Sequence, residues 1–283
     1  TPTLINPRFI TGQDTDLLES LQQEHRVIVT LEDGSFLIVD GGANIGKTDH
    51  TRLWNLLKQL NERPDGKIVI AAWLLTHNHA DHYQVFEDFC AEYGSQVTIE
   101  QFVCNVPDSI VAYNSTDPGT HYQNGFSKSS LAAGGIRNIK PYTGMKWSVR
   151  NVELEVLFTQ ADLYPKKLTL YNDSSMAFRM TVAGQTMLWL GDIQTNASDV
   201  ICAMYGENLK SDMVQVSHHG GNGATEQLYT LIRPTVAFWP CDRANYQGYI
   251  RHFPASDLLA NRLGVKKNIV ADPDHTLTFP FLS

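Results

Sequence analysis

Residues 76–82 read Thr-His-Asn-His-Ala-Asp-His and directly follow an almost unbroken apolar run at 67–75, KIVIAAWLL. The apolar run predicts a β-strand that is buried on both faces, and residues 81–93 predict a helix after it. Three imidazoles and one carboxylate therefore share a strand-to-helix turn. Neutral imidazole and carboxylate are ligands that Zn²⁺, Mn²⁺ and iron accept. The stretch predicts a metal site with four candidate ligands, His77, His79, Asp81 and His82.

Two later strands end in side chains of the same kinds. Residues 188–192, LWLGD, form an apolar run that ends in Gly-Asp, and residues 212–217 predict a buried strand before His218, His219 and two glycines. On its own, Asp192 would more often cap a helix than bind a metal. A carboxylate at one strand end and a histidine at the next can nevertheless complete a two-metal site. The preceding strand favours His218 as the ligand, with His219 as the alternative.

The rest of the chain alternates hairpins with helix–strand units in both halves. A hairpin is predicted at 26–42 around an Asp-Gly turn, a helix through the leucines of 53–60, and strands at 96–104 and 152–158. A second hairpin (175–183 and 185–190), helices (195–206, 224–232, 255–263) and strands (235–239, 268–271, 276–280) follow. Residues 105–150 predict a long irregular segment. The pattern predicts one α/β domain over 1–283, a four-layer αββα sandwich of two mixed sheets with the helices outside.

Charge and hydropathy limit the partners. The 283 residues include 22 Lys plus Arg and 30 Asp plus Glu, for a formal net charge of −8. Nucleic-acid binders usually carry a basic stripe, and no basic cluster here exceeds a pair, so nucleic acid is a disfavoured partner. No apolar run approaches the roughly 20 residues that cross a bilayer, and we expect no transmembrane segment.

The cysteines bear on the cellular compartment. Cys90, Cys104, Cys202 and Cys241 form no CxxC pair, which argues against a structural zinc knuckle and favours a reducing, cytoplasmic compartment. Because the sequence begins Thr1-Pro2-Thr3 without an initiator Met, a secreted or cell-surface location stays open. The oligomeric state is not indicated.

The order of these motifs resembles the metallo-β-lactamase superfamily over nearly the whole chain. The motifs are Val39-Asp40-Gly41-Gly42, the histidine-rich heptad, Gly191-Asp192 and His218-His219-Gly220. The likeness is strongest to the hydrolase domain of bacterial competence (DNA-uptake) proteins and its free-standing relatives. It extends to Asn172-Asp173-Ser174-Ser175 and to Asn245 with His252-Phe253-Pro254, which has one extra residue before the proline.

The resemblance implies a ligand set. His77 and His79 would hold the first metal, Asp81, His82 and His218 the second, Asp192 would bridge them, and Asp40 would orient the ligands from behind. The chain departs from the family in two places. Tyr83-Gln84-Val85 replace the usual glycines after the heptad, and Asn172-Asp173 stand where a third histidine of the first site is usual. Asp173 or Asn172 would complete that site, or it would stay weakly occupied; His121 is an outside candidate.

The implied activity is metal-dependent hydrolysis. Two divalent ions about 3.5–4 Å apart lower the pKa of a water between them, with zinc first and manganese or iron as alternatives. Asp81 would take or orient the proton, and His252 would serve the leaving group. The favoured substrate is a phosphate ester, as for a phosphodiesterase, of a small molecule or of an envelope or lipid head group. The alternatives are an amide, lactone or thioester hydrolase, and a binding module with an incomplete metal site.

Overall fold

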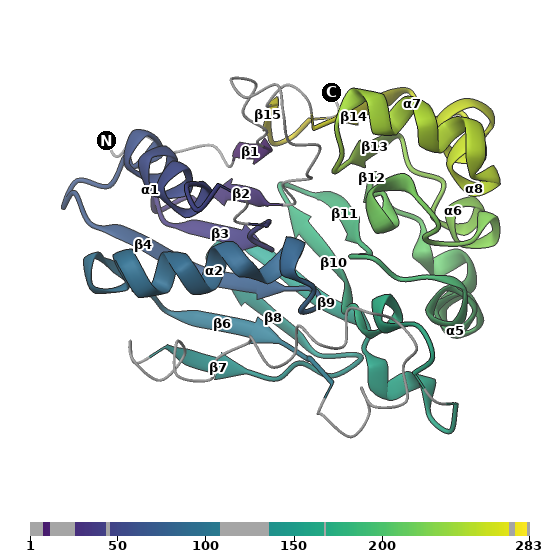
Figure 1. Cartoon of the computed structure of the whole chain (residues 1–283), viewed down its shortest axis with the longest axis horizontal. Coiled ribbons are helices and arrows are strands. Elements are labelled where there is room, and N and C mark those ends of the chain that lie inside the picture. The colour runs from purple at the N-terminus through teal and green to yellow at the C-terminus, as the bar shows by residue number, and fades with distance from the viewer. Residues whose placement is uncertain are drawn as a thin grey trace.

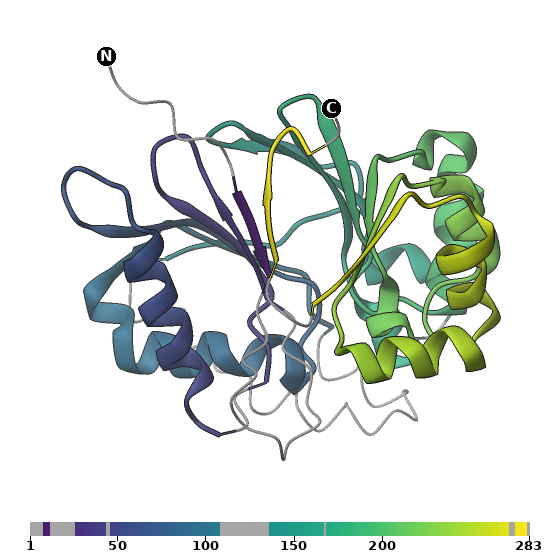
Figure 2. The same cartoon turned by 90° about the horizontal axis from the view of Figure 1, so that it is seen from above.

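Two β-sheets pack face to face, with helices on the outer face of each sheet (Figures 1 and 2). The computed structural model describes residues 8–11, 26–43, 46–107, 136–166, 168–271 and 275–281. Seen from above, α1 and α2 cover one outer face, and α5 to α8 cover the other (Figure 2). The predicted αββα sandwich of two mixed sheets is confirmed.

The first sheet has the strand order β15-β1-β2-β3-β4-β6-β7, with β5 also paired to β4. The pairs from β15 to β3 are antiparallel, and those from β3 to β7 are parallel. Its strands are β1 (Arg8–Thr11), β2 (Val27–Thr30), β3 (Phe36–Val39), β4 (Ile68–Leu75), β5 (Val97–Ile99), β6 (Gln101–Cys104), β7 (Arg137–Ile139) and β15 (His275–Thr278). Helices α1 (Asp49–Leu60) and α2 (Ala80–Tyr93) pack on it. The predicted first hairpin is β2–β3, and the predicted strand at 96–104 is divided at Glu100.

The second sheet has the order β14-β13-β12-β11-β10-β9-β8, antiparallel from β8 to β11 and parallel from β11 to β14. Its strands are β8 (Lys146–Val149), β9 (Val152–Phe158), β10 (Ala177–Val182), β11 (Gln185–Trp189), β12 (Met213–Gln215), β13 (Val236–Trp239) and β14 (Lys267–Val270). The helices beside it are α5 (Thr195–Tyr205), α6 (Glu226–Ile232), α7 (Arg243–His252) and α8 (Pro254–Asp257). A π-helical turn, Leu258–Arg262, continues α8.

Three strands and one α-helix were not predicted, and the first of them is β1, which precedes the predicted hairpin at 26–42. Strands β7 and β8 lie inside the segment 105–150, which the sequence analysis expected to be irregular. Helix α7 also lacks a clear sequence signal, because none of its side chains is fully buried and its apolar positions are few. Its start is fixed instead by Asp242, whose side chain accepts a hydrogen bond from the Asn245 backbone amide at 2.6 Å. Edge strands and surface helices of this kind carry little periodic apolar pattern.

The core has three apolar layers, one between the two sheets and one between each sheet and its helices. All eight residues of β4 are buried, as predicted for a strand covered on both faces. Trp73 and Leu75 pack with the helices of the first sheet, whereas Ala72 and Leu74 pack between the sheets. This burial fixes the position of the strand end from which the histidine-rich heptad continues. Among the described residues, no helix has the length and apolar character needed to cross a bilayer.

Candidate metal centre

Histidine and aspartate side chains from both sheets converge where β4, β11 and β12 end. Two groups are formed, and in each the potential ligand atoms lie within 4.8 Å of one another. One group is Asp81, His82, Asp192 and His219; the other is His77, His79 and Asp192. Asp192 belongs to both. Three chain segments far apart in the sequence therefore meet around one carboxylate.

The four-residue group is closely spaced. The Oδ2 atom of Asp192 lies 3.1 Å from Nε2 of His219 and 3.3 Å from Nε2 of His82. Oδ2 of Asp81 lies 3.4 Å from Nε2 of His219 and 3.8 Å from Nε2 of His82. Both imidazoles thus turn the same ring nitrogen toward the two carboxylates.

The three-residue group is looser. Nε2 of His77 lies 3.9 Å from Oδ2 of Asp192, and the rings of His77 and His79 lie edge to face with their centroids 4.6 Å apart. The ring of Tyr171 stacks on His79 at 5.1 Å, and its hydroxyl donates a hydrogen bond to Oδ1 of Asn78. Tyr171 was not predicted as a site residue, because nothing in the sequence connects residue 171 with the heptad.

Asp40 lies behind the heptad. Its carboxylate accepts hydrogen bonds from the Thr76 backbone amide at 2.8 Å and from the Thr76 hydroxyl at 2.9 Å. Its Oδ2 atom also lies 2.9 Å from Nδ1 of His82. Since a carboxylate accepts, His82 donates from Nδ1, and Nε2 is the ring nitrogen that faces Asp192. Burial raises the pKa of Asp40, and the neighbouring His82 opposes that rise.

Two glycines let the segments approach closely. A Cβ at Gly191, where φ is +53°, would lie 2.9 Å from the Cβ atoms of Thr76 and Ser175. A Cβ at Gly41 would lie 3.1 Å from the backbone nitrogen of Phe86, and the Gly41 amide donates to the His82 carbonyl at 2.6 Å. The Gly-Gly and Gly-Asp pairs noted in the sequence thus mark places where only glycine fits without displacement.

The structure brings His219 to the group and not His218, which corrects the preference drawn from the sequence. Strand β12 ends at Gln215, and both histidines have left-handed backbones, with φ of 50° and 61°. The alternation of a strand therefore does not extend to them. His218 is half-buried; its Nε2 lies 3.2 Å from Nδ2 of Asn172, and its Nδ1 lies 3.1 Å from the Asn222 carbonyl oxygen.

Asp173 is in neither group and supports a helix instead. Its Oδ1 atom accepts hydrogen bonds from the backbone amides of Gln194 at 2.6 Å and Ala197 at 3.4 Å, at the start of α5. Burial raises its pKa. Asn172 is buried, and its Oδ1 atom has no hydrogen-bond partner among the described residues. The remaining candidate for the first site, His121, lies outside the described residues.

His252 is not brought into either group. It lies exposed in the last turn of α7, where its Nδ1 is 2.7 Å from the Gly248 carbonyl oxygen of the same helix. Helix α7 packs against the turn at 217–220, because Tyr249 lies close to Gly220 and Tyr246 meets Trp239 edge to face. The helix therefore borders the segment that carries His219.

Charges within the group compensate one another. Burial favours the neutral form of Asp192, but His219 and His82 outweigh it and hold the pKa of Asp192 well below its usual value. Burial likewise opposes the charged form of His219, and Asp192 and Asp81 raise its pKa to about 9. The pKa of His82 is raised in the same way, by Asp192 and Asp40 against burial. The carboxylates thus attract positive charge to this place.

The residues fit a pair of divalent cations. Nε2 of His77 and Oδ1 of Asp192 are buried and make no hydrogen bond to any described residue, and burial lowers the pKa of His77, aided by His82 and His79. A neutral imidazole with an unshared lone pair and a charged carboxylate are the forms that bind metals. The side chain of Asp81 is 37% exposed, against 0–6% for His77, His82, Asp192 and His219, so Asp81 faces solvent.

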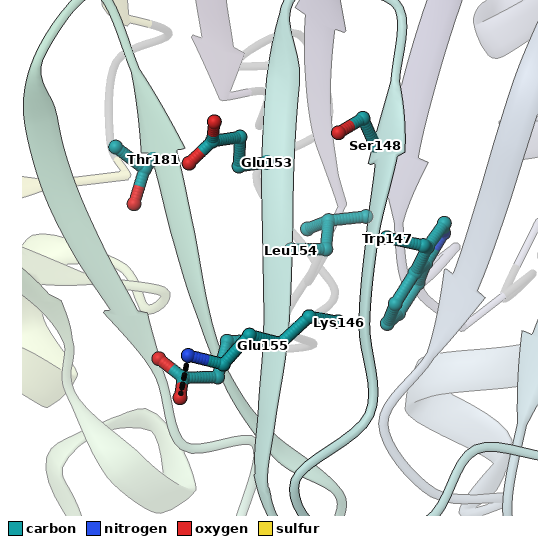
Figure 3. Close-up of a pocket in the computed structure, with 7 residues that line it drawn as sticks. All are labelled: Lys146, Trp147, Ser148, Glu153, Leu154, Glu155 and Thr181. Atoms are coloured by element: carbon teal, nitrogen blue, oxygen red, sulfur yellow. Dashed lines mark ion pairs between the residues drawn. The ribbon is translucent and has the colours of Figure 1, made fainter.

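A hollow of about 370 Å³ on the second sheet is separate from these groups. Figure 3 shows it on β8, β9 and β10, with the ion pair of Lys146 and Glu155 (Nζ to Oε1, 2.9 Å) beside it. It shares no residue with the metal groups. Its walls are mainly polar side chains of a sheet edge.

Comparison with known proteins agrees on the fold. No protein-family model and no curated protein matches the sequence. Among solved structures, the metallo-beta-lactamase fold protein YhfI from Bacillus subtilis superposes with a TM-score of 0.55 at 11% identity, over 96% of this chain and 99% of YhfI. A diphosphatase from the PhnP family gives 0.51 at 12% identity, over 96% and 98%.

A third solved structure is longer than this chain. CmlA, a diiron beta-hydroxylase from Streptomyces venezuelae, gives a TM-score of 0.55 at 13% identity over 98% of this chain. The chain spans 55% of the length of CmlA. At such identities the likeness concerns the fold and not the activity. The layers, the sheet order and these superpositions together show that the chain has a metallo-β-lactamase fold.

Proposed function

We propose that this chain is a binuclear metal-dependent hydrolase of a phosphate ester, resembling a phosphodiesterase in its reaction. The position of Asp192 carries the proposal, because one carboxylate belongs to both groups of potential ligands. A shared carboxylate is what two neighbouring ions need in order to be held a few ångström apart.

The proposed ligands follow the two groups. His77, His79 and Asp192 would hold one ion, and Asp81, His82, Asp192 and His219 the other. Zinc suits this set of nitrogen and oxygen donors, with manganese or iron as alternatives. Two bound divalent ions supply a lowered pKa for a water molecule and stabilise charge that develops on a phosphoryl oxygen.

The protein residues have separate tasks in this proposal. Asp81, as the exposed carboxylate of its group, is placed to take up the proton of the attacking water. Asp40 keeps the ring of His82 in the orientation that presents Nε2 to Asp192. His252 stays a proposed hydrogen-bond donor or acid for the leaving group, supported by the contact of α7 with the turn at 217–220.

The proposed substrate is a phosphate ester of a small molecule or of an envelope or lipid head group. Two-metal sites serve in-line displacement at phosphorus in many phosphatases and nucleases. The net charge of −8 and the lack of basic clusters disfavour a nucleic acid. This reasoning also disfavours the DNA-uptake role suggested by the likeness to competence proteins, although single-stranded nucleic acid belongs in the substrate panel.

The test combines metal content with turnover. Metal-free protein is loaded with zinc or manganese, desalted and subjected to elemental analysis. The assayed substrates are bis-p-nitrophenyl phosphate, a single-stranded oligonucleotide, nitrocefin and a thioester. We expect two ions per chain and turnover of the phosphodiester. The substitution D81N should lower kcat by about 10²–10⁴-fold, the usual contribution of a general base. The exposed Asp199 in α5 offers a matched control, D199N, that should keep full activity.

Other outcomes would contradict the proposal in distinct ways. Turnover of nitrocefin or the thioester alone would establish an amide or thioester hydrolase. A metal content no higher than trace level, together with no turnover, would favour a binding module. Full activity of H252A would remove His252 from the mechanism and leave the rest of the proposal intact.

A further inference from the structure

His218, next to the metal group but not in it, has a defined ring orientation. Its Nδ1 atom lies 3.1 Å from the Asn222 carbonyl oxygen, and its Nε2 atom lies 3.2 Å from Nδ2 of Asn172. A carbonyl oxygen only accepts hydrogen bonds, so Nδ1 of His218 donates to Asn222. Nε2 is the ring nitrogen that faces the Asn172 amide, whose Nδ2 atom can donate to it.

This contact fixes which way the amide of Asn172 is turned. Its Nδ2 atom points to His218, so its Oδ1 atom is directed to the other side. The Oδ1 atom is buried and accepts no hydrogen bond from any described residue, and the residue is 5% exposed. A buried amide oxygen without a donor is unfavourable unless something else satisfies it.

The neighbours of Asn172 touch the looser metal group on two sides. Tyr171 stacks on the ring of His79, and the hydroxyl of Ser175 accepts a hydrogen bond from the Asp192 backbone amide at 3.0 Å. Asn172 lies between these two residues, in the 3₁₀ turn Tyr171–Ser174. The turn and the residue after it therefore contact both His79 and Asp192, two members of the three-residue group.

We propose that Oδ1 of Asn172 is a further ligand of the His77–His79–Asp192 position, and that His218 is the positioning residue that turns this oxygen toward the ion. The inference rests on the metal binding of the proposed function. It supplies the fourth donor that the three-residue group lacks. It also assigns a role to His218, which lies next to the four-residue group but does not belong to it.

An amide ligand makes the two positions unequal. The Asp81–His82–Asp192–His219 position has two carboxylates, whereas the His77–His79–Asp192–Asn172 position has only the shared one. Greater negative charge and shorter spacing favour the former for a divalent cation. The protein should therefore bind its two ions in sequence, with the weaker ion at the position that Asn172 completes.

The test measures metal affinity and does not depend on turnover. Metal-free protein is titrated with Zn²⁺ in competition with a chromophoric chelator, and with Co²⁺ to follow the visible spectrum of each ion. The variants are N172A, N172D, H218A, H218Q and the double variant N172A/H218A. The matched controls are N261A and N261D, because Asn261 is exposed and its Nδ2 atom donates a surface hydrogen bond to Oδ1 of Asp257.

We expect effects on the weaker ion alone. N172A should lower its affinity by about 10- to 100-fold, the range seen when a residue supporting a metal site is lost, and N172D should raise it because a charged oxygen replaces a neutral one. H218A should weaken it, and H218Q should restore it, since a glutamine amide can both donate to Asn222 and accept from Asn172. In the N172A background, H218A should add nothing.

The contradicting results are equally specific. An unchanged weaker ion in both N172A and N172D overturns the assignment of Asn172, and an H218A effect that persists in the N172A background overturns the positioning role of His218. If N172A does not fold, N172D and the His218 variants decide the question. Wild-type protein that binds no ion would contradict the proposed function itself, whereas two ions that ignore Asn172 would contradict only this inference.

Discussion

The two sheets contribute to the metal centre in different ways. The first-sheet arm (His77, His79, Asp81 and His82) places four donors within six residues of one strand-to-helix turn. The second-sheet arm (Asp192 and His219) brings one donor from each of two strand ends. The first arm is specified by one short motif, while the second depends on how separate strands are aligned. The candidate ligands of the first arm can therefore be predicted from a local motif, whereas those of the second arm depend on the tertiary structure.

The supports of the two arms differ accordingly. Asp40 holds the first arm through Thr76 and His82. In the second arm the amide of Gln215 accepts from the backbone amides of Leu190 and Gly191 and donates to the carbonyl oxygens of Gly191 and Val216. Gln215 thus ties the end of β11 to the end of β12. A charged side chain orients one arm, and a fully hydrogen-bonded amide aligns the other.

The largest effect should come from Asp192, the residue on which the two arms depend equally. D192N keeps the shape of the side chain but removes the charge shared by both groups. We expect the affinity for both ions to fall by more than about 100-fold, beyond the range typical of residues that only support a ligand. Elemental analysis after dialysis measures the loss. If D192N retained one ion at full affinity, Asp192 would belong to one group only.

A histidine pair sharpens the comparison within the second arm. H219A should lower the affinity of the tighter ion by at least about 100-fold, because His219 contacts both carboxylates of the four-residue group. H218A should leave the tighter ion within a few-fold of wild type. Chelator competition on the two purified variants gives both numbers. The reverse ranking would restore His218 as the ligand and refute the placement seen here.

This pair also shows where sequence reasoning reaches its limit. The heptad, the buried strand before it and the Gly-Asp strand end were all predicted, because apolar runs and clustered imidazoles are local patterns. The choice between His218 and His219 was not predictable, since both residues have positive φ and the alternation of β12 stops before them. A left-handed pair turns its side chains in directions that no strand or helix period describes.

Other differences have similar causes. Asn172 and Asp173 are adjacent and polar, yet one faces His218 and the other the start of α5. Their side chains point in different directions because both residues lie in a 3₁₀ turn, which no pattern in the sequence predicts. Likewise, β7 has no buried residue. Its pairing with β6 makes it a strand, but an exposed strand has no apolar alternation from which it could be predicted.

The support of the first arm can be tested at Asp40. D40N removes the charge that holds Nδ1 of His82 and Thr76 in place, without changing the volume of the side chain. We expect metal affinity at the His82 position to fall by about 10- to 100-fold, less than for D192N. Competition titration of D40N beside wild type provides the comparison. An unchanged affinity would mean that backbone contacts alone orient His82.

Asp173 separates helix capping from metal binding. Gln194 precedes α5 without a side-chain cap of its own, and Asp173 provides the acceptor instead. D173A should therefore lower the free energy of unfolding by about 1–2 kcal/mol, as for loss of an N-cap, and leave both metal affinities unchanged. Urea unfolding and metal titration of the same preparation check the two parts. A loss of one ion without a loss of stability would make Asp173 a ligand.

The smallest effect is expected at the opposite end of the sandwich, where the sheets are joined by ion pairs. Arg150, in the β8–β9 turn, lies 2.8 Å from Asp33 in the β2–β3 turn and 2.7 Å from Glu100 between β5 and β6. Burial alone would raise the pKa of Asp33, but hydrogen bonds from Ser35 and Arg150 lower it to about 2 from the usual 3.8.

A carboxyl whose pKa is lower in the folded chain stabilises the fold above its unfolded pKa, and this contribution is lost as the pH falls from about 4 to 2. The Asp33 side chain is 34% exposed, so solvent screening reduces the contribution to about 1 kcal/mol. D33N should therefore destabilise the protein by about that amount at pH 6 and by progressively less as the pH falls from about 4 to 2, which urea unfolding at several pH values measures. A difference that stays undiminished at pH 2 would show that Asp33 acts through hydrogen-bond geometry and not through charge. In that case the two ends of the sandwich would differ in kind. Charge is expected to decide metal affinity at one end, and hydrogen-bond geometry would decide the stabilisation by Asp33 at the other.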